Sequence, residues 1–242
     1  MRLSAPIFRL KRQAKLLSRT QGIPLHQALN QIAVNEGYNA WSHLAASATP
    51  TSLSPRSLSE TILTELAEGD MLLLAARPGH GKTLAGLEIA ATAHRKGRNG
   101  LFFTLDYHEQ DVVRRLSQIT DTANVATDKV VIDTSDEICA DHIIRRLSRM
   151  SGPSVAVIDY LQLLDQRRCT PELDTQLAQL QRHVQTSGDI VVVISQIDRS
   201  FEASGKDLPD LNDVRLPNPV DLSRFTRTCF LHDGSVNYSR VA

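Results

Sequence analysis

The sequence predicts an α/β fold, in which a mainly parallel, twisted sheet follows a small all-helical module. Three observations predict it. From about residue 71 onward, short apolar runs alternate with longer amphipathic stretches, which is typical of parallel strands covered by helices on both faces. Before residue 48, apolar residues recur instead at helical spacing. Residues 48–57 are rich in Ser, Thr and Pro and predict a linker between the two parts.

The first part, residues 1–47, is predicted to contain three short helices. Pro24 can begin the second helix and Gly37 can end it. A third helix is expected over residues 39–46, with Trp41 as a core anchor rather than a platform for stacking bases. The expected apolar faces are Leu10, Ala14 and Leu17 in the first helix, and Leu25, Leu29 and Ile32 in the second.

Charge is unevenly distributed along the chain, although the formal net charge is zero. Residues 1–50 carry six basic residues and one acid, which leaves 21 basic and 26 acidic residues in the remainder. A basic head on an acidic body predicts an acidic partner for the module, either nucleic acid or a protein. A solvated basic helix face is an equally good interpretation.

The cysteines and the apolar runs bear on the compartment. The three cysteines form no CxxC pair, so they predict neither a zinc site nor a redox motif and fit a reducing cytoplasm. The apolar runs all fall short of the roughly 20 residues that span a bilayer, and no signal-peptide pattern opens the chain. We therefore expect a cytoplasmic protein without a membrane partner.

The second part, residues 58–242, is expected to form the α/β domain. Its predicted helices cover residues 58–68, 84–96, 137–150 and 172–186. Its predicted strands cover residues 71–75, 101–105, 130–132, 155–158 and 190–194, followed by two terminal strands at 226–231 and 236–239.

The run ARPGHGKT, residues 76–83, predicts a loop that holds nucleotide phosphates. Glycines let backbone N–H groups close around phosphates, and the start of the next helix adds its positive dipole end. Lys82 would reach the outer phosphates, and the Thr83 hydroxyl would bind Mg²⁺. The predicted nucleotide-binding residues are Ala76, Arg77, Pro78, Gly79, His80, Gly81, Lys82, Thr83 and Leu84.

An acid follows the fourth apolar run, where VAVI precedes Asp159. The end of this strand is where a protein with such a loop places the carboxylate that holds Mg²⁺ through water. Thr83 and Asp159 are therefore the predicted metal ligands.

Four segments in the right order resemble the C-terminal ATPase domain of the DnaB-type replicative DNA helicases, which has a RecA-like fold. They are ARPGHGKT, FFTLDYHEQDVVRRL, VAVIDYLQLL and VVVISQIDR, and the likeness spans about residues 58–232. The run DYLQL is the most specific match. The helical module does not resemble the N-terminal domain of that family.

The resemblance implies ATP and Mg²⁺ as cofactors and assigns catalytic roles. Lys82 would bind phosphate, and Gln196 would sense the γ-phosphate. The general base of the family is a glutamate, but Asp106 stands at that place and is one methylene shorter. A base must lie within hydrogen-bond distance of its water, directly or through one more water, so three outcomes stay open: Asp106 works slowly, works through a second water, or does not work. Glu109 is a weaker candidate for the base.

The resemblance also implies single-stranded DNA as a partner and a homo-oligomer such as a hexameric ring. DNA-binding loops would follow the fourth and fifth strands, where Arg167, Arg168, Arg199 and Lys206 are candidate contacts to the phosphate backbone. A solvated loop is the alternative for these segments. Ring helicases also lend an arginine finger to the neighbouring subunit, and Arg240 is the terminal arginine that could serve.

Three functions remain open at this point. The first is an ATP-driven helicase or remodeller on single-stranded DNA. The second is a nucleotide-gated module that binds DNA or protein, with weak hydrolysis and no unwinding. The third, an adaptor with a relic loop, is disfavoured because Lys82, Thr83, Asp159 and Gln196 are all present.

Overall fold

The computed structural model describes residues 4, 7–38, 40, 41, 44, 55–123, 129–165, 170–216 and 218–241. Contacts within the chain divide it into two compact units, Met1–Ser52 and Leu53–Ala242. Each unit is considered by itself. Among the described residues, every helix is too short or too polar to cross a lipid bilayer.

The smaller unit contains helices α1 (Ile7–Gln21) and α2 (Leu25–Asn35). Its small core holds Leu10, Ala33 and Leu44, and Trp41 packs against this core as expected. Helix α2 has Glu36 as its C-cap, one residue before the predicted Gly37, whose φ is 85°. The N–H of Gly37 donates to the Val34 carbonyl, and that of Tyr38 donates to the Ala33 carbonyl. These two bonds define the Schellman ending that favours glycine.

The predicted apolar face of α2 is wrong in one position. Leu25 is 41% exposed, whereas Ala28 and Ala33 are fully buried. In α1, Ala14 and Leu10 are both buried, as predicted. The expected third helix, residues 39–46, lies largely outside the described residues.

Helix α4 (Pro55–Glu65) begins earlier than predicted and ends earlier. Proline is tolerated in the first turn of a helix because its missing N–H would have no helical partner there. The last three residues of the predicted linker therefore belong to this helix, while residues 48–54 lie outside the described part of the chain.

The larger unit is built on a seven-stranded sheet with the order β3-β2-β4-β5-β1-β6-β7. Every neighbouring pair is parallel except β6 and β7, which are antiparallel. All seven strands were predicted, and their ends agree with the prediction to within two residues. They are β1 (Met71–Ala76), β2 (Asn99–Thr104), β3 (Val130–Asp133), β4 (Ser154–Asp159), β5 (Ile190–Gln196), β6 (Arg227–His232) and β7 (Ser235–Arg240).

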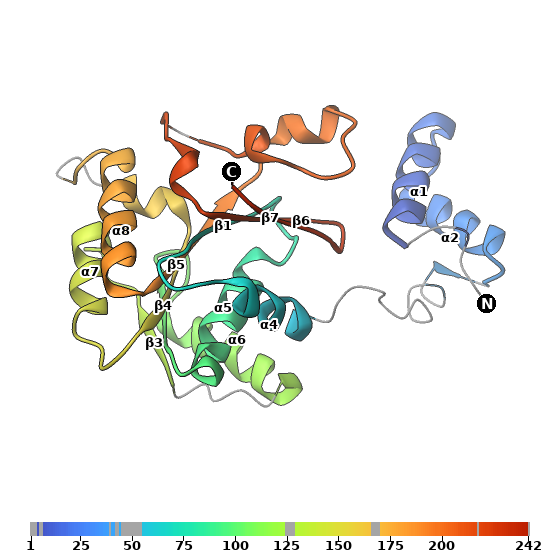
Figure 1. Ribbon diagram of the computed structural model, residues 1–242. Helices are drawn as coiled ribbons and strands as arrows, with labels where there is room; N and C mark the ends of the chain where they lie inside the picture. The colour runs from blue at the N-terminus through green and yellow to red at the C-terminus, as the bar shows by residue number, and fades with distance from the viewer. Residues whose placement is uncertain are drawn as a thin grey trace. The chain divides into compact units, whose positions relative to one another are not determined.

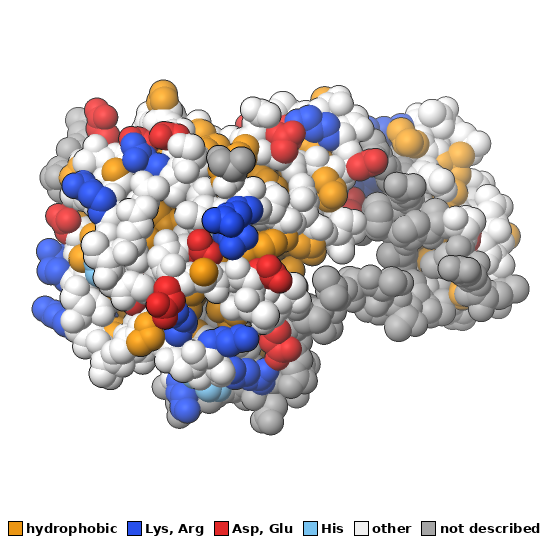
Figure 2. Space-filling model, viewed as in Figure 1, with side chains coloured by type: hydrophobic (Ala, Val, Ile, Leu, Met, Phe, Trp, Pro, Cys, Tyr) orange, Lys and Arg blue, Asp and Glu red, His pale blue; other side chains and the backbone are white. Residues whose placement is uncertain are grey.

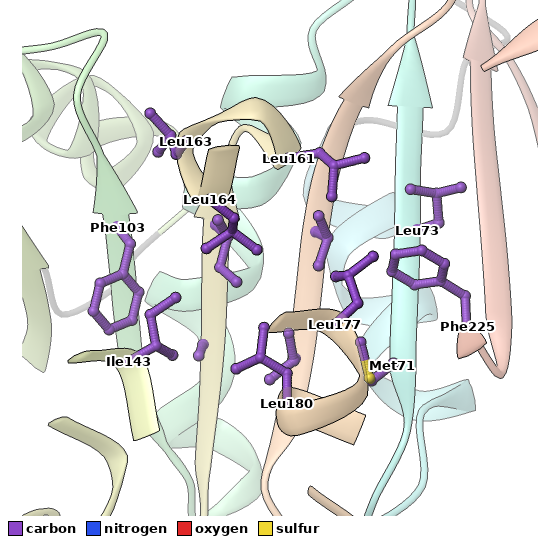
Figure 3. Packing of buried hydrophobic residues seen from close by; sticks show 14 of the residues in the cluster. Met71, Leu73, Phe103, Ile143, Leu161, Leu163, Leu164, Leu177, Leu180 and Phe225 are labelled. Carbon is purple, nitrogen blue, oxygen red and sulfur yellow. The ribbon is translucent and has the colours of Figure 1, made fainter. Parts of the chain in front are cut away.

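Helices cover both faces of the sheet, as Figure 1 shows. Helices α4, α5 (Lys82–Thr92) and α6 (Glu109–Ala123) pack on one face. Helices α7 (Ala140–Leu147) and α8 (Leu173–Ser187) pack on the other. Alternate residues of β1 serve the two layers, since Leu72 and Leu74 face the first and Leu73 faces the second. Figure 3 shows the second layer, where leucines from α8 and from the segment after β4 pack against this face of the sheet.

Helix α5 approaches the sheet unusually closely at Gly86. A Cβ at this position would lie 2.6 Å from Ile194 Cδ1 and 3.0 Å from Val157 Cγ1. At Gly100 of β2, a Cβ would lie 2.0 Å from the Ala90 carbonyl oxygen. Two glycines therefore let this helix lie against β2, β4 and β5 where larger residues would clash.

Several local elements were not predicted. Helix α7 is shorter than the expected stretch of residues 137–150, and α6 has no counterpart among the predicted helices. Short 3₁₀ helices occur at η3 (Leu161–Asp165), η4 (Arg199–Ala203), η5 (Leu211–Asp213) and η6 (Leu222–Arg224). The tight turn between β6 and β7 consists of Asp233 and Gly234, with φ of 46° and 80°, as two-residue hairpins require.

Glu88 is an ionisable side chain buried between α4 and α5. It is 6% exposed, and its Oε2 atom has no hydrogen-bond partner among the described residues. Burial raises the pKa of Glu88 to about 7, although a hydrogen bond from Ser59 of α4 lowers it. The ionised form is therefore disfavoured in the folded protein.

Replacement of Glu88 by Gln should stabilise the protein in a pH-dependent way. The wild type loses stability as pH rises from about 4.5 to about 7, because the unfolded carboxyl ionises first. Above pH 7 the Glu88→Gln variant should gain on the order of 1–3 kcal/mol in free energy of unfolding, and near pH 4.5 the gain should vanish. Urea denaturation at pH 5 and pH 8 measures this. The exposed Glu137→Gln variant is the control, and an equal gain at both pH values would contradict the assignment.

Candidate nucleotide-binding site

Four parallel strands bring their carboxyl ends to one edge of the sheet. Thr104 of β2 lies opposite Asp159 of β4, which in turn lies opposite Ile194 of β5. Ala76, the last residue of β1, lies opposite Gln196, the last residue of β5. The ends of β2, β4, β5 and β1 therefore lie side by side, where open parallel sheets place their ligand sites.

The phosphate loop, residues 76–83, turns sharply between β1 and α5. Gly79 and Gly81 have φ of 84° and 82°, which is the left-handed region that favours glycine. A Cβ at either glycine would meet no atom of the described chain within 4 Å, so backbone conformation rather than space requires glycine here. Gly81 is the N-cap of α5. The first N–H groups of a helix lack helical partners, which suits them to an anion.

Thr83 and Asp159 meet at the centre of this edge. The Thr83 hydroxyl donates a hydrogen bond to the Asp159 carboxylate. Asp159 is 2% exposed, and its Oδ2 atom has no hydrogen-bond partner in the part of the chain that the structure describes. Burial raises the pKa of Asp159 to about 6, while the bond from Thr83 and the charge of Lys82 lower it. One carboxylate oxygen is thus buried, close to a cation and unpaired with any described group.

These groups fit the Mg²⁺ ion that the sequence predicts. Magnesium prefers hard oxygen ligands and is usually held by one or two protein oxygens together with waters and phosphates. Thr83 and Asp159 supply a hydroxyl and a carboxylate that already touch each other. The Asp159 Oδ2 atom, which no described residue pairs with, is the observation that favours this assignment, because buried polar atoms normally have partners.

The structure brings the predicted base, Asp106, close to Lys82. The N–H of Asp106 donates to the Thr104 hydroxyl at 3.2 Å. Partial desolvation raises the pKa of Asp106, and the charge of Lys82 acts against that rise. Tyr160 lies near both carboxylates. Burial and, after it, the charges of Asp106 and Asp159 raise the pKa of Tyr160. Tyr160 belongs to the DYLQL run, but the sequence assigns it no role at the site. Glu109, the weaker candidate, is exposed in the first turn of α6.

Gln196 occupies the junction between β5 and the segment that follows it. Residues 197–216 are called the β5 loop below. The N–H of Ile197 donates to the Ala76 carbonyl at 3.1 Å, and the N–H of Arg215 donates to the Gln196 carbonyl at 2.8 Å. Both ends of the β5 loop are therefore anchored beside the phosphate loop, with Gln196 between them.

Two side chains of the phosphate loop point to other segments. The Arg77 guanidinium donates to the Ile197 carbonyl and to Glu202 of η4. The His80 ring stacks on His232 of β6, with ring centroids 5.1 Å apart. Both side chains therefore contact other segments of the chain, and the N–H of His80 donates to the Arg77 carbonyl at 3.2 Å; their role in nucleotide binding stays a prediction. No sequence motif marks Glu202 or His232, so these neighbours were missed.

The candidate DNA contacts differ from one another. Arg167 and Arg168 lie outside the described residues. Arg199 is exposed on η4 and makes no ion pair with any described residue. Lys206 pairs with Asp210 at 2.9 Å and with Asp213 at 3.0 Å. Its charge is largely neutralised, so Arg199 is the better placed of these two candidates.

A buried amide holds the two ends of the segment after β4 together. The Gln176 side chain of α8 donates from Nε2 to the carbonyls of Leu164 and Pro171, and its Oε1 accepts from the Ala140 N–H. The described residues on either side of the two candidate arginines are therefore joined at one point.

Arg240 lies far along the sheet from the phosphate loop of its own chain. It pairs with Arg227 at the start of β6, whereas Ala76 pairs with Leu231 near the end of β6. Its predicted role as an arginine finger concerns a neighbouring subunit and stays a prediction.

The strand order and the phosphate loop define an α/β protein with a RecA-like sheet. The chain belongs to the family of the DnaB-like helicase C terminal domain, whose model matches residues 56–132 and 116–220. The resemblance that the four sequence segments indicated is thereby confirmed.

Curated relatives agree with this membership. The chain is 28% identical over 187 residues to the replicative DNA helicase DnaB of Geobacillus stearothermophilus, covering 63% of this chain and 40% of that protein. It is 25% identical over 230 residues to DnaB of Leifsonia xyli subsp. xyli, covering 82% of this chain and 50% of that protein. The chain thus spans half or less of the length of these relatives.

Solved structures show the same fold. A chain described as an ATPase domain superposes with a TM-score of 0.58 at 18% identity, over 79% of this chain and 80% of that one. A DnaB-like replicative helicase, solved in a study of its interactions with primase, superposes with a TM-score of 0.55 at 16% identity, over 92% of this chain and 64% of that one. The predicted RecA-like fold is confirmed.

Replacement of Asp159 by Asn should stabilise the protein when neither nucleotide nor metal is bound. At pH 7.5 the buried carboxylate is ionised at a free-energy cost, since its folded pKa of about 6 exceeds the ordinary 3.8. The amide keeps an acceptor for Thr83 and removes the charge. We expect a gain on the order of 1–2 kcal/mol, measured by thermal unfolding in EDTA. A lower melting temperature would mean that Asp159 is a structural rather than a ligand-binding carboxylate.

Proposed function

We propose that this chain binds and hydrolyses ATP with Mg²⁺ at the edge formed by β1, β2, β4 and β5, and that it acts on single-stranded DNA as an oligomer. One observation carries the proposal. The Thr83 hydroxyl donates to the buried Asp159 carboxylate, which lies near the charge of Lys82 and whose Oδ2 atom has no hydrogen-bond partner among the described residues. A hydroxyl, a carboxylate and an ammonium beside a helix start are the groups that phosphate transfer to water needs.

Each residue has a distinct task in this proposal. The N–H groups of residues 79–83 and the Lys82 ammonium bind the phosphate oxygens. Thr83 and Asp159 would hold Mg²⁺, which when bound offsets the negative charge of the phosphates. Asp106 accepts a proton from the attacking water, and its raised pKa makes it a better base than a free aspartate. Gln196 meets the terminal phosphate from the end of β5.

The partners are proposed from the relatives. The curated relatives are named replicative DNA helicases, and action on single-stranded DNA as a ring is inferred for this chain on that basis. Arg199 provides an exposed cation on the β5 loop for phosphate contact. The cytoplasm is the proposed compartment.

One feature favours the alternative of a nucleotide-gated binding module with weak hydrolysis. The β5 loop contains five acidic and three basic residues, and Lys206 is already paired with two of the acids. On the face of the larger unit that Figure 2 shows, acidic and basic side chains are intermixed rather than gathered into one field. A binding surface of mixed charge fits a protein partner as well as DNA.

Turnover of ATP with and without single-stranded DNA tests the proposal. The wild type should hydrolyse ATP faster when DNA is present. The Lys82→Ala change should raise the Kd for ATP about tenfold or more. A strand-displacement assay on a forked duplex distinguishes a helicase from a nucleotide-gated binding module. Tight ATP binding with turnover at background and no displacement would leave the binding module as the function.

Asp106 offers a test of the base that is independent of DNA. The isosteric Asp106→Asn change should lower kcat by roughly 10²–10⁴-fold and leave the Kd for ATP nearly unchanged, since an amide cannot accept the proton. Asp106→Glu adds one methylene of reach and should raise kcat. Glu109→Gln is the matched control. Equal kcat values for Asp106→Asn and wild type would exclude Asp106 as the base.

A further inference from the structure

The outer side of the phosphate loop is held by the β5 loop through Arg77. The Arg77 side chain is 13% exposed, and its Nη2 lies 2.9 Å from Glu202 Oε1. Its Nε donates to the same carboxylate oxygen at 3.0 Å, and Nη1 donates to the Ile197 carbonyl at 3.0 Å. Three hydrogen bonds therefore join this arginine to a segment about 120 residues further along the chain.

The β6–β7 turn holds the same loop through His80. The His80 ring is nearly parallel to that of His232, with an interplanar angle of 10°. The N–H of Asp233 donates to His80 Nδ1 at 3.1 Å. The rings of Phe201 of η4 and His232 are nearly perpendicular, with an interplanar angle of 83° and ring centroids 4.9 Å apart. Because Phe201 and Glu202 are adjacent, η4 contacts both residues that support the phosphate loop: Arg77 through Glu202, and His232, on which His80 stacks, through Phe201.

We propose that Glu202 is a positioning residue through which the β5 loop and the nucleotide site influence each other. Its carboxylate sets the place of Arg77, which lies two residues before Gly79, so a shift of η4 moves the phosphate loop directly. Nucleotide held by the phosphate loop then restrains η4, and a partner bound on the β5 loop changes the affinity for nucleotide. This linkage is reciprocal, and it is separate from Gln196. It rests on the proposed function in that ATP is the nucleotide.

The chain contains an ion pair that closely matches Arg77–Glu202 and lies at the opposite end of the sheet, where β1 and β2 begin. The Arg98 side chain is 11% exposed, donates to the Gly188 carbonyl at 2.9 Å and pairs with Glu68 at 3.2 Å. Glu68 is 75% exposed and Glu202 is 64% exposed. Glu68→Ala therefore removes the same kind of interaction as Glu202→Ala, but before the start of β1 rather than beside the phosphate loop.

Limited trypsin digestion of the full chain tests the linkage without DNA. Cleavage after Arg199, in η4, is followed by mass spectrometry with and without saturating Mg-ATP, and cleavage after the exposed Arg149 is the internal reference. In wild type and in Glu68→Ala, ATP should slow cleavage after Arg199 about threefold or more. In Glu202→Ala this protection should be lost, and Glu202→Gln, which keeps an acceptor for Arg77, should restore part of it.

Affinity for ATP and thermal stability complete the test. Glu202→Ala should weaken ATP binding about three- to tenfold relative to Glu68→Ala at similar melting temperatures. Arg77→Lys, which keeps the charge but lacks the planar fork, should behave like Glu202→Ala, and the double variant should be no weaker than either one. Protection that survives in Glu202→Ala, or is lost equally in Glu68→Ala, overturns the proposal. Absence of ATP binding in wild type would instead overturn the proposed function, and the Kd measurement identifies that case.

Discussion

The close approach of α5 to the sheet is the constraint on which the candidate site depends. At Gly86 the helix lies so near β4 and β5 that a single methyl group would collide with Ile194. This contact decides how far the start of the helix stands from the ends of the strands. Thr83, one turn earlier, consequently meets Asp159 rather than solvent. Packing inside the core thus determines the geometry of oxygen ligands at the edge.

The phosphate loop has two sides with different chemistry. Its inner side presents Lys82 and Thr83 to two acids whose pKa values are raised by desolvation. Its outer side is tied by Arg77 and His80 to the β5 loop and to the β6–β7 turn. Raised pKa values and an unpaired buried oxygen are unfavourable in a folded protein without ligand, and such groups gather at functional sites. The contacts of Arg77 and His80 on the outer side are, in contrast, satisfied hydrogen bonds of the kind that stabilises a folded protein.

The sequence predicts what depends on neighbouring residues and misses what depends on distant ones. The strands, the phosphate loop and the acid at the end of β4 follow from apolar runs and from local glycine chemistry, and the structure contains all of them. The contacts of Arg77 with Glu202 and of His80 with His232 join residues more than 100 positions apart, and no local pattern marks them. Leu25 was misplaced for the same reason, since helical spacing identifies an apolar face but not the residues that a neighbour covers.

Gln176 makes the segment after β4 suitable for protein engineering, because it joins the two ends of that segment. One buried amide bridges the carbonyls of Leu164 and Pro171. These two residues are called the stems of the segment, and the amide joins them independently of the residues between them. The entropy of closing a loop grows only slowly with its length. The stretch between these stems is therefore a natural place for insertions or for a grafted recognition sequence, because the amide does the joining from α8.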